Sequence, residues 1–105
     1  MEKRYSLSFD KVILKQLKKA AKNNHIKQIL TKMLNSIEEY GPDAGALLDS
    51  QLFIYEIKNM HPPIRLYFQH SKELNEIKIF EYEMKTSQEK QQNTIEKIKR
   101  KISEA

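Results

Sequence analysis

The order of apolar and polar residues changes character twice in the first forty positions. Residues 5–9 alternate apolar and polar, as in a strand with one face on a core. From Val12 to Ala21 apolar residues recur every three or four positions with lysines between them, which predicts an amphipathic helix. Asp10 precedes this helix and can accept hydrogen bonds from the free N–H groups of its first turn.

A second helical stripe follows a short break at Asn23 and Asn24. It runs through residues 26–40 and ends at Gly41 and Pro42, a helix-terminating glycine and a residue that cannot continue the hydrogen-bond ladder. Two helices with so short a connection predict an antiparallel helical hairpin.

The second half of the chain has three strand-like segments. We expect a loop over residues 43–50 and strands over residues 51–58, 64–70 and 76–84. The stiff turn at residues 60–63, with two prolines, and the polar loop at residues 71–75 are short, so the strands should form an antiparallel meander.

A final helix is predicted near the C-terminus. Residues 86–89 have the spacing of a capping box, and Ile95, Ile98 and Ile102 form a narrow apolar stripe beyond it. The predicted fold is therefore one α+β domain over residues 1–105, with an N-terminal strand, a helical hairpin, a three-strand meander and a C-terminal helix (β-α-α-β-β-β-α).

Charge favours a polyanionic partner and is unevenly distributed. The formal net charge of the 105 residues is +5. Residues 10–24 hold five lysines and one aspartate, residues 36–60 five acidic residues and one lysine, and residues 85–105 six basic and three acidic residues. Solvated helix faces explain most of this pattern, and the basic excess adds weight to nucleic-acid binding.

Several classes of protein are not expected. Without cysteine there is no disulfide framework or thiolate zinc site, and the three histidines lack a metal-binding spacing, so we expect neither metal nor cofactor. The N-terminus has no apolar signal segment and no apolar run approaches the roughly 20 residues that cross a bilayer. A soluble, cytoplasmic protein with no membrane partner is the expectation.

Four short motifs carry a family resemblance. They are Glu39-Tyr40-Gly41, Ile54-Tyr55-Glu56-Ile57-Lys58, Ile64-Arg65-Leu66-Tyr67-Phe68 and Tyr82-Glu83-Met84-Lys85-Thr86. They resemble, in order and spacing, the E-Y-G, L-Y-E-L-R, Y-R-V-x-Y and F-x-K-K-T motifs of HigB-like toxins in the RelE/ParE superfamily. Two positions depart from the pattern, since Lys58 replaces an arginine and Met84 replaces the first lysine of the K-K pair.

The resemblance implies an endoribonuclease. Such toxins cut messenger RNA without a metal, usually on the ribosome, and are held by an antitoxin that in HigB-like members often carries a helix-turn-helix domain. Arg65 matches the catalytic arginine and Lys85 the second lysine, with phosphate contact or proton transfer as their expected roles. The structural alternatives are a salt bridge from Arg65 to Glu56 and a solvated Lys85.

Further RNA contacts are predicted with less specific signals. Lys58 could bind the phosphate backbone, Tyr67 and Tyr82 could stack on a base, and His61 could transfer protons near neutral pH. For each, the ordinary structural role of that residue type is the competing interpretation.

Two other functions fit the same motifs. Met84 in place of lysine favours a RelE-fold protein that binds RNA, the ribosome or a partner without cutting. A ParE-like poison of gyrase, acting by protein contact, shares the fold. Arg65 and Lys85 at the family positions make us favour the nuclease.

Overall fold

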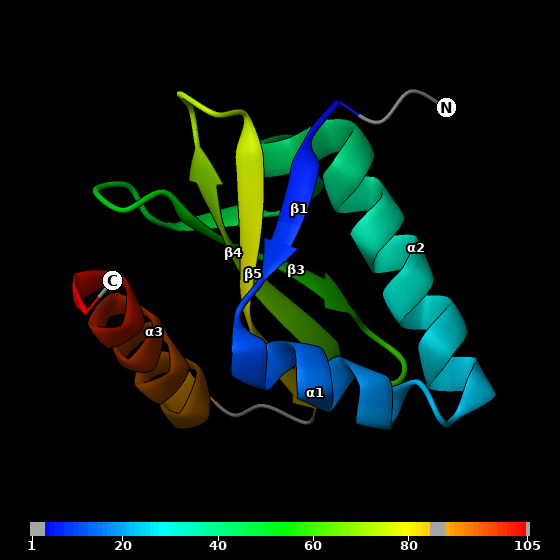
Figure 1. Ribbon diagram of the computed structural model, residues 1–105. Coiled ribbons are helices and arrows are strands. Elements are labelled where there is room, and N and C mark those ends of the chain that lie inside the picture. The colour runs from blue at the N-terminus through cyan, green and yellow to red at the C-terminus, as the bar shows by residue number, and fades with distance from the viewer. Residues whose placement is uncertain (1–3, 85–87, 105) are drawn as a thin grey trace.

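The computed structural model describes residues 4–84 and 88–104 and has one five-stranded sheet between two layers of helices (Figure 1). In chain order the elements are β1 (Ser6–Phe9), α1 (Lys11–Ala20), α2 (Asn24–Tyr40), the short 3-10 helix η1 (Gly41–Ala44), β2 (Ala46–Asp49), β3 (Ile54–Asn59), β4 (Ile64–Ser71), β5 (Glu76–Met84) and α3 (Gln88–Ser103). The strand order is β1-β5-β4-β3-β2. Helices α1 and α2 cover one face, and α3 lies on the other (Figure 1).

Side chains at the helix ends explain where the two predicted helices begin and end. The Asp10 carboxylate accepts from the Val12 N–H, which confirms it as the cap of α1. Asn23 caps α2 by accepting from the N–H groups of residues 25 and 26. Gly41 ends α2 with a φ of 57°, a left-handed conformation that glycine adopts at little cost.

The antiparallel meander is confirmed. β3 pairs antiparallel with β4, and β4 with β5, while β1 adds to β5 in parallel. β3 begins at Ile54, three residues later than expected, because Asp49 accepts hydrogen bonds from the N–H groups of Gln51 and Leu52 and holds a turn there.

The loop predicted at residues 43–50 is wrong, because it contains β2. This strand pairs antiparallel with β3 and contains a register shift between Leu47 and Asp49. Its four residues are too few for a clear alternation, and two of them are exposed. The middle strand, predicted to end at His70, extends one residue further to Ser71. The predicted capping box falls partly on residues 85–87, which lie outside the described residues.

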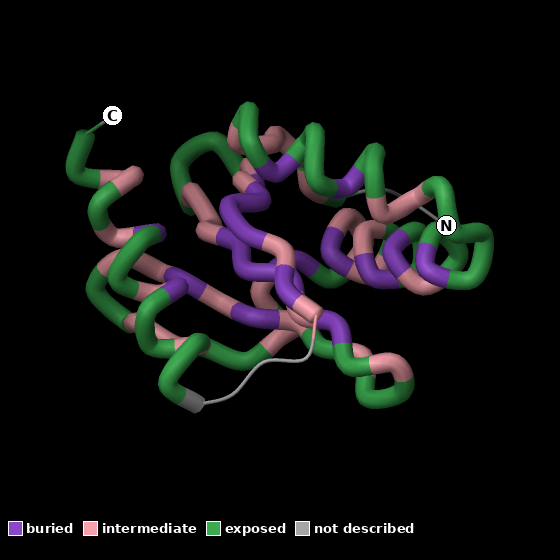
Figure 2. The backbone as a smooth tube through the Cα atoms, turned by 90° about the horizontal axis from the view of Figure 1, so that it is seen from below, coloured by how far each residue is buried: buried purple, intermediate pink, exposed green. Residues whose placement is uncertain are grey.

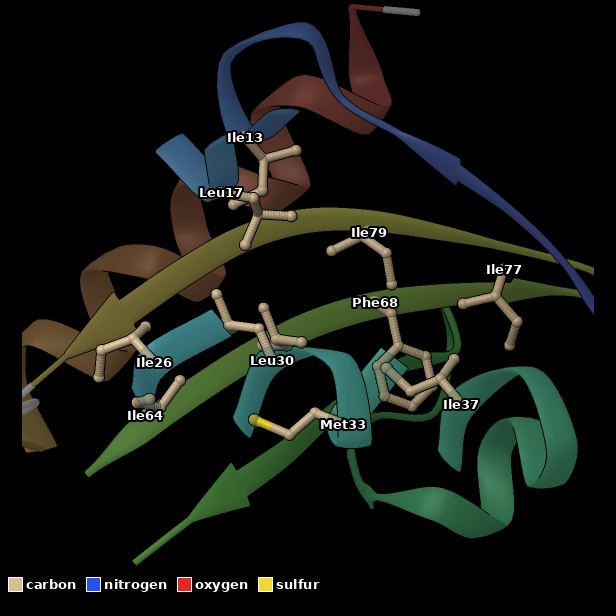
Figure 3. Close-up of a cluster of buried hydrophobic side chains, with 11 residues drawn as sticks. Ile13, Leu17, Ile26, Leu30, Met33, Ile37, Ile64, Phe68, Ile77 and Ile79 are labelled. Carbon is tan, nitrogen blue, oxygen red and sulfur yellow. The ribbon is translucent and has the colours of Figure 1, made fainter. Parts of the chain in front are cut away.

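Two cores lie on opposite faces of the sheet. The larger one joins α1 and α2 to β4 and β5, and Figure 3 shows its members; they include Ile13, Leu30, Ile37, Leu66 and Phe68. The smaller one lies under α3 and contains Ile54, Tyr67, Phe80 and Ile98. Buried residues therefore follow the central strands, and exposed residues lie on the outer helix faces and in the loops (Figure 2).

None of the helices in the described part of the chain has the length and apolar character needed to cross a membrane.

Candidate active site

Side chains of β3, β4 and β5 form two polar rows on the sheet face that packs against α3. Register places Lys58 opposite Arg65 and Arg65 opposite Glu83, which makes the first row. The second row is Glu56, Tyr67 and Glu81. Alternation along each strand sends these positions to the same face as the buried Ile54. The first row lies at the end of the sheet where β3 turns into β4.

Arg65 is held by a carboxylate. Its Nη1 donates to Glu56 Oε2 over 2.7 Å, with the side chains 24% and 10% exposed. The same oxygen accepts from Gln91 Nε2 of α3, also over 2.7 Å. The salt bridge considered as the structural alternative for Arg65 is therefore present. It leaves the other guanidinium N–H groups of Arg65 as possible donors, since arginine has five.

Lys58 and Arg65 share a small hollow at the end of the first row. Its volume is about 160 Å³, and it is lined by Lys58, Asn59, Met60, Pro63, Ile64 and Arg65. Lys58 is exposed and Arg65 is partly exposed, so both cations can be reached from solvent. His61 is exposed in the same turn but does not line the hollow. Two cations at one open hollow suit an anionic group such as a phosphate.

The two tyrosines are not placed with this hollow. Tyr67 is fully buried, so its ring is not free to stack on a base in this arrangement. Burial, and then the nearby Glu83 carboxylate, raises the pKa of Tyr67 far above its ordinary value. Tyr82 packs with the larger core on the opposite face, beside a hollow of about 340 Å³ that Gln16, Lys19 and Ala20 also line. Burial raises its pKa too.

Lys85 lies outside the described residues, so its expected role in phosphate contact or proton transfer stays a prediction. The residue before it, Met84, is the register partner of Ile64 and packs against the larger core. The methionine at the position of the family's first lysine therefore adds to the core in this chain.

Of the three buried carboxylates of this face, the sequence indicated Glu56 as a partner of Arg65 but gave no sign of Glu81 and Glu83. Glu56, Glu81 and Glu83 are 8%, 5% and 7% exposed. Glu81 binds Lys97 over 3.1 Å and Lys101 over 2.6 Å, both from α3. β5 has a register shift opposite Tyr67 and Phe68, so Phe80 and Glu81 both occur where regular pairing would have a single residue. The shift breaks the alternation of side chains along β5 and hides that its two buried glutamates share this face.

Lys101 connects α3 to the rest of the molecule through hydrogen bonds. Its Nζ donates to Glu81, to Asp10 over 3.0 Å and to the Phe80 carbonyl over 3.3 Å. Burial lowers the pKa of Lys101, but the hydrogen bonds to Glu81 and Asp10 outweigh it and hold that pKa above its ordinary value. Within the described ranges, no three His, Asp or Glu side chains come together as a metal site would require.

Comparison with known proteins shows the fold. No protein-family model and no curated protein sequence matches the chain. Among solved structures it is similar to the isolated E. coli RelE toxin, with 22% identity, 90% of this chain and 98% of that chain covered, and a TM-score of 0.63. A free E. coli RelE variant with two arginines changed to alanine has a TM-score of 0.70 at 22% identity, covering 90% and 98% of the chains. The E. coli RelBE toxin–antitoxin complex gives 0.62 at 23% identity, covering 79% and 99%. The chain thus has the fold of RelE, as its order of elements predicted.

Proposed function

We propose that this protein is the toxin of a toxin–antitoxin pair and cleaves messenger RNA as a metal-independent endoribonuclease on the ribosome. One observation carries the proposal: on a RelE fold, Lys58 and Arg65 are neighbours across β3 and β4 and line one open hollow. The motif series supports the proposal that this toxin belongs to the HigB-like branch.

The two cations have different proposed roles in binding the phosphate. Cleavage by the neighbouring 2′-hydroxyl develops negative charge on the phosphate oxygens, and donors fixed in advance stabilise that charge. Arg65 is fixed by its bond to Glu56 and keeps further N–H groups for the phosphate. Lys58 adds a mobile point charge at the rim, and Lys85 is proposed as a third cation for phosphate contact or proton transfer.

An antitoxin is the proposed protein partner. The structural neighbours include RelE in complex with its antitoxin, and the HigB-like motifs point to a partner with a helix-turn-helix domain. Within the acidic stretch between residues 36 and 60, Asp43 is exposed, and we propose that it faces a basic part of such a partner.

A second candidate is RNA or partner binding without cleavage. The observation in its favour is that Glu56 offsets the charge of Arg65 at 2.7 Å, while Met84 removes one family cation. Such a protein would bind RNA in a salt-sensitive way and cut none.

The two candidates separate in a reconstituted translation reaction. The wild type should cut a translated message, and Arg65→Ala should slow cutting by about 100-fold or more, the effect of losing one transition-state donor. Arg100→Ala, at an exposed position of α3, removes the same charge and should cut like the wild type. If the wild type leaves the message intact, the nuclease proposal fails; if it binds RNA but leaves it intact, the second candidate stands.

A further inference from the structure

Two glutamates of β5 are buried on the same face of the sheet but differ in their hydrogen-bond partners. Glu81 and Glu83 lie two residues apart, on the same face, and are 5% and 7% exposed. Glu81 has two lysine partners from α3. Both carboxylate oxygens of Glu83 are buried and receive no hydrogen bond in the structure described. The Tyr67 hydroxyl is buried beside Glu83 and close enough for interaction with that carboxylate to raise the Tyr67 pKa, but the pair does not reach ordinary hydrogen-bond geometry.

A buried carboxylate without donors weakens a fold. Polar groups in protein interiors are almost always paired, and an exception needs a reason such as a catalytic role. The partnered Glu81 has a structural reason, since it holds α3 on the sheet. Among the described residues Glu83 forms no ion pair with α3, so attachment of that helix does not explain why a carboxylate is buried at this position.

Position connects Glu83 to the proposed cleavage site. It stands directly opposite Arg65, on the side away from Lys58, so the three residues form one row across the sheet. Neighbouring strands lie about 4.8 Å apart, so the backbone of Glu83 lies one strand spacing from that of Arg65. The other carboxylate beside Arg65, Glu56, already accepts from Arg65 and Gln91. Of the two carboxylates beside Arg65, Glu83 is thus the one that accepts no hydrogen bond of ordinary geometry, with the Tyr67 hydroxyl as its nearby donor.

We propose that Glu83 is the catalytic proton acceptor of the site, an inference that rests on the proposed nuclease function. The 2′ O–H bond breaks and its proton passes to a carboxylate oxygen of Glu83. The 2′ oxygen bonds to phosphorus, and the bond from phosphorus to the 5′ oxygen breaks, with water supplying the proton of the leaving group. The products are a 2′,3′-cyclic phosphate and a 5′-hydroxyl end, and the proton on Glu83 returns to solvent.

Burial sets a condition on this step. The oxygens of Glu83 are shielded in the free protein, so bound RNA has to displace whatever covers them before the 2′-hydroxyl reaches them. Until then the carboxylate is kept from water.

The pair of glutamates supplies its own control. Glu83→Gln, nearly identical in shape, should lower kcat by about 100-fold or more, the size of a lost general base, with KM for the RNA unchanged. Its melting temperature should stay level or rise, because a buried unpaired charge is removed. Glu81→Gln should do the reverse, with a lower melting temperature and an unchanged kcat. Glu83→Asp keeps a carboxylate and should retain more activity than Glu83→Gln.

Several results would overturn the assignment. If the wild type cleaves RNA and Glu83→Gln cleaves equally fast, Glu83 is not the acceptor while the nuclease function survives. If Glu83→Gln loses stability and activity together, as Glu81→Gln loses stability, its role is structural. A wild type that cuts no RNA removes the nuclease function and this role with it.

Discussion

Arg65 has two tasks in this account, one in the fold and one in the site. Its bond to Glu56 satisfies a carboxylate that is only 10% exposed, and the same bond fixes the guanidinium beside the hollow. A structural salt bridge and a phosphate-binding arginine are therefore not exclusive alternatives here. The pair was foreseen from the sequence as the competing interpretation, and the structure makes it the support of the proposed function.

Removing Arg65 should also cost stability. Arg65→Ala leaves Glu56 with the hydrogen bond from Gln91, and an under-satisfied buried carboxylate should lower the free energy of unfolding by about 1–3 kcal/mol. Urea unfolding measures this. Arg65→Lys keeps a cation and should lose less, and an Arg65→Ala protein as stable as the wild type would show that the pair contributes nothing.

At this scale the sequence predicted chemistry better than placement. Arg65 and Lys58 were named from motifs and share the hollow. Tyr67 and Tyr82 were named for their rings, but Tyr67 is buried in the core under α3. Tyr82 lies on the opposite face, because a register shift in β5 changes which of its side chains share a face. The same shift hid Glu81 and Glu83 from the sequence.

Among the secondary-structure elements, the end of α2 depends on one glycine. Gly41 has a φ of 57°, and a Cβ added there would collide with the ring of Tyr5. Gly41→Ala should lower the free energy of unfolding by more than about 1 kcal/mol, since an L-residue is strained at this φ and the ring has to move. Asn35→Ala, at an exposed position inside α2, is the control and should change little. Equal stability of the two variants would contradict the packing described.

The attachment of α3 depends on Lys101. Lys101→Met removes three hydrogen bonds and leaves Glu81 with Lys97 alone. We expect the free energy of unfolding to fall by about 1.5–3 kcal/mol, as for hydrogen bonds to charged groups. Amide hydrogen exchange should speed up more in α3 than in α2. Arg100→Met changes the exposed neighbour and should leave exchange unaltered. Uniformly faster exchange over the whole chain would instead mean that α3 does not open separately.

Periodicity decided which elements could be predicted. Long amphipathic stretches gave α1, α2 and the three strands of the meander, since burial against one core repeats along them. The four-residue β2 carries no repeat and forms because β3 offers it a free edge, which is a tertiary effect. The parallel pairing of β1 with β5 likewise depends on chain topology and has no local signal.

For the whole molecule, charge links stability to pH. Burial would raise the pKa of Asp10, but the hydrogen bond and charge of Lys101 outweigh it, and the pKa lies below its ordinary value of 3.8. The resulting stabilisation is complete above pH 3.8 and is lost as the pH falls through the lower folded value. The raised pKa of Lys101 acts in the opposite sense, with its stabilisation complete below pH 10.5 and lost above it.

Unfolding by urea at pH 6 and pH 3 should show the acid limb. The free energy of unfolding should fall between the two, and the fall should be smaller in Asp10→Asn, because asparagine keeps the helix cap and cannot change its charge. A fall as large in the variant as in the wild type would remove Asp10 from the explanation.

If Lys58 and Arg65 together bind a single RNA phosphate, a crystal structure with bound RNA will show that phosphate between them. A short RNA with 2′-O-methyl groups cannot be cut and should be captured intact. We expect one phosphate in the hollow between β3 and β4, within hydrogen-bond distance of the Arg65 guanidinium and close to the Lys58 ammonium. RNA bound elsewhere on the surface, with Arg65 still paired only to Glu56, would contradict it.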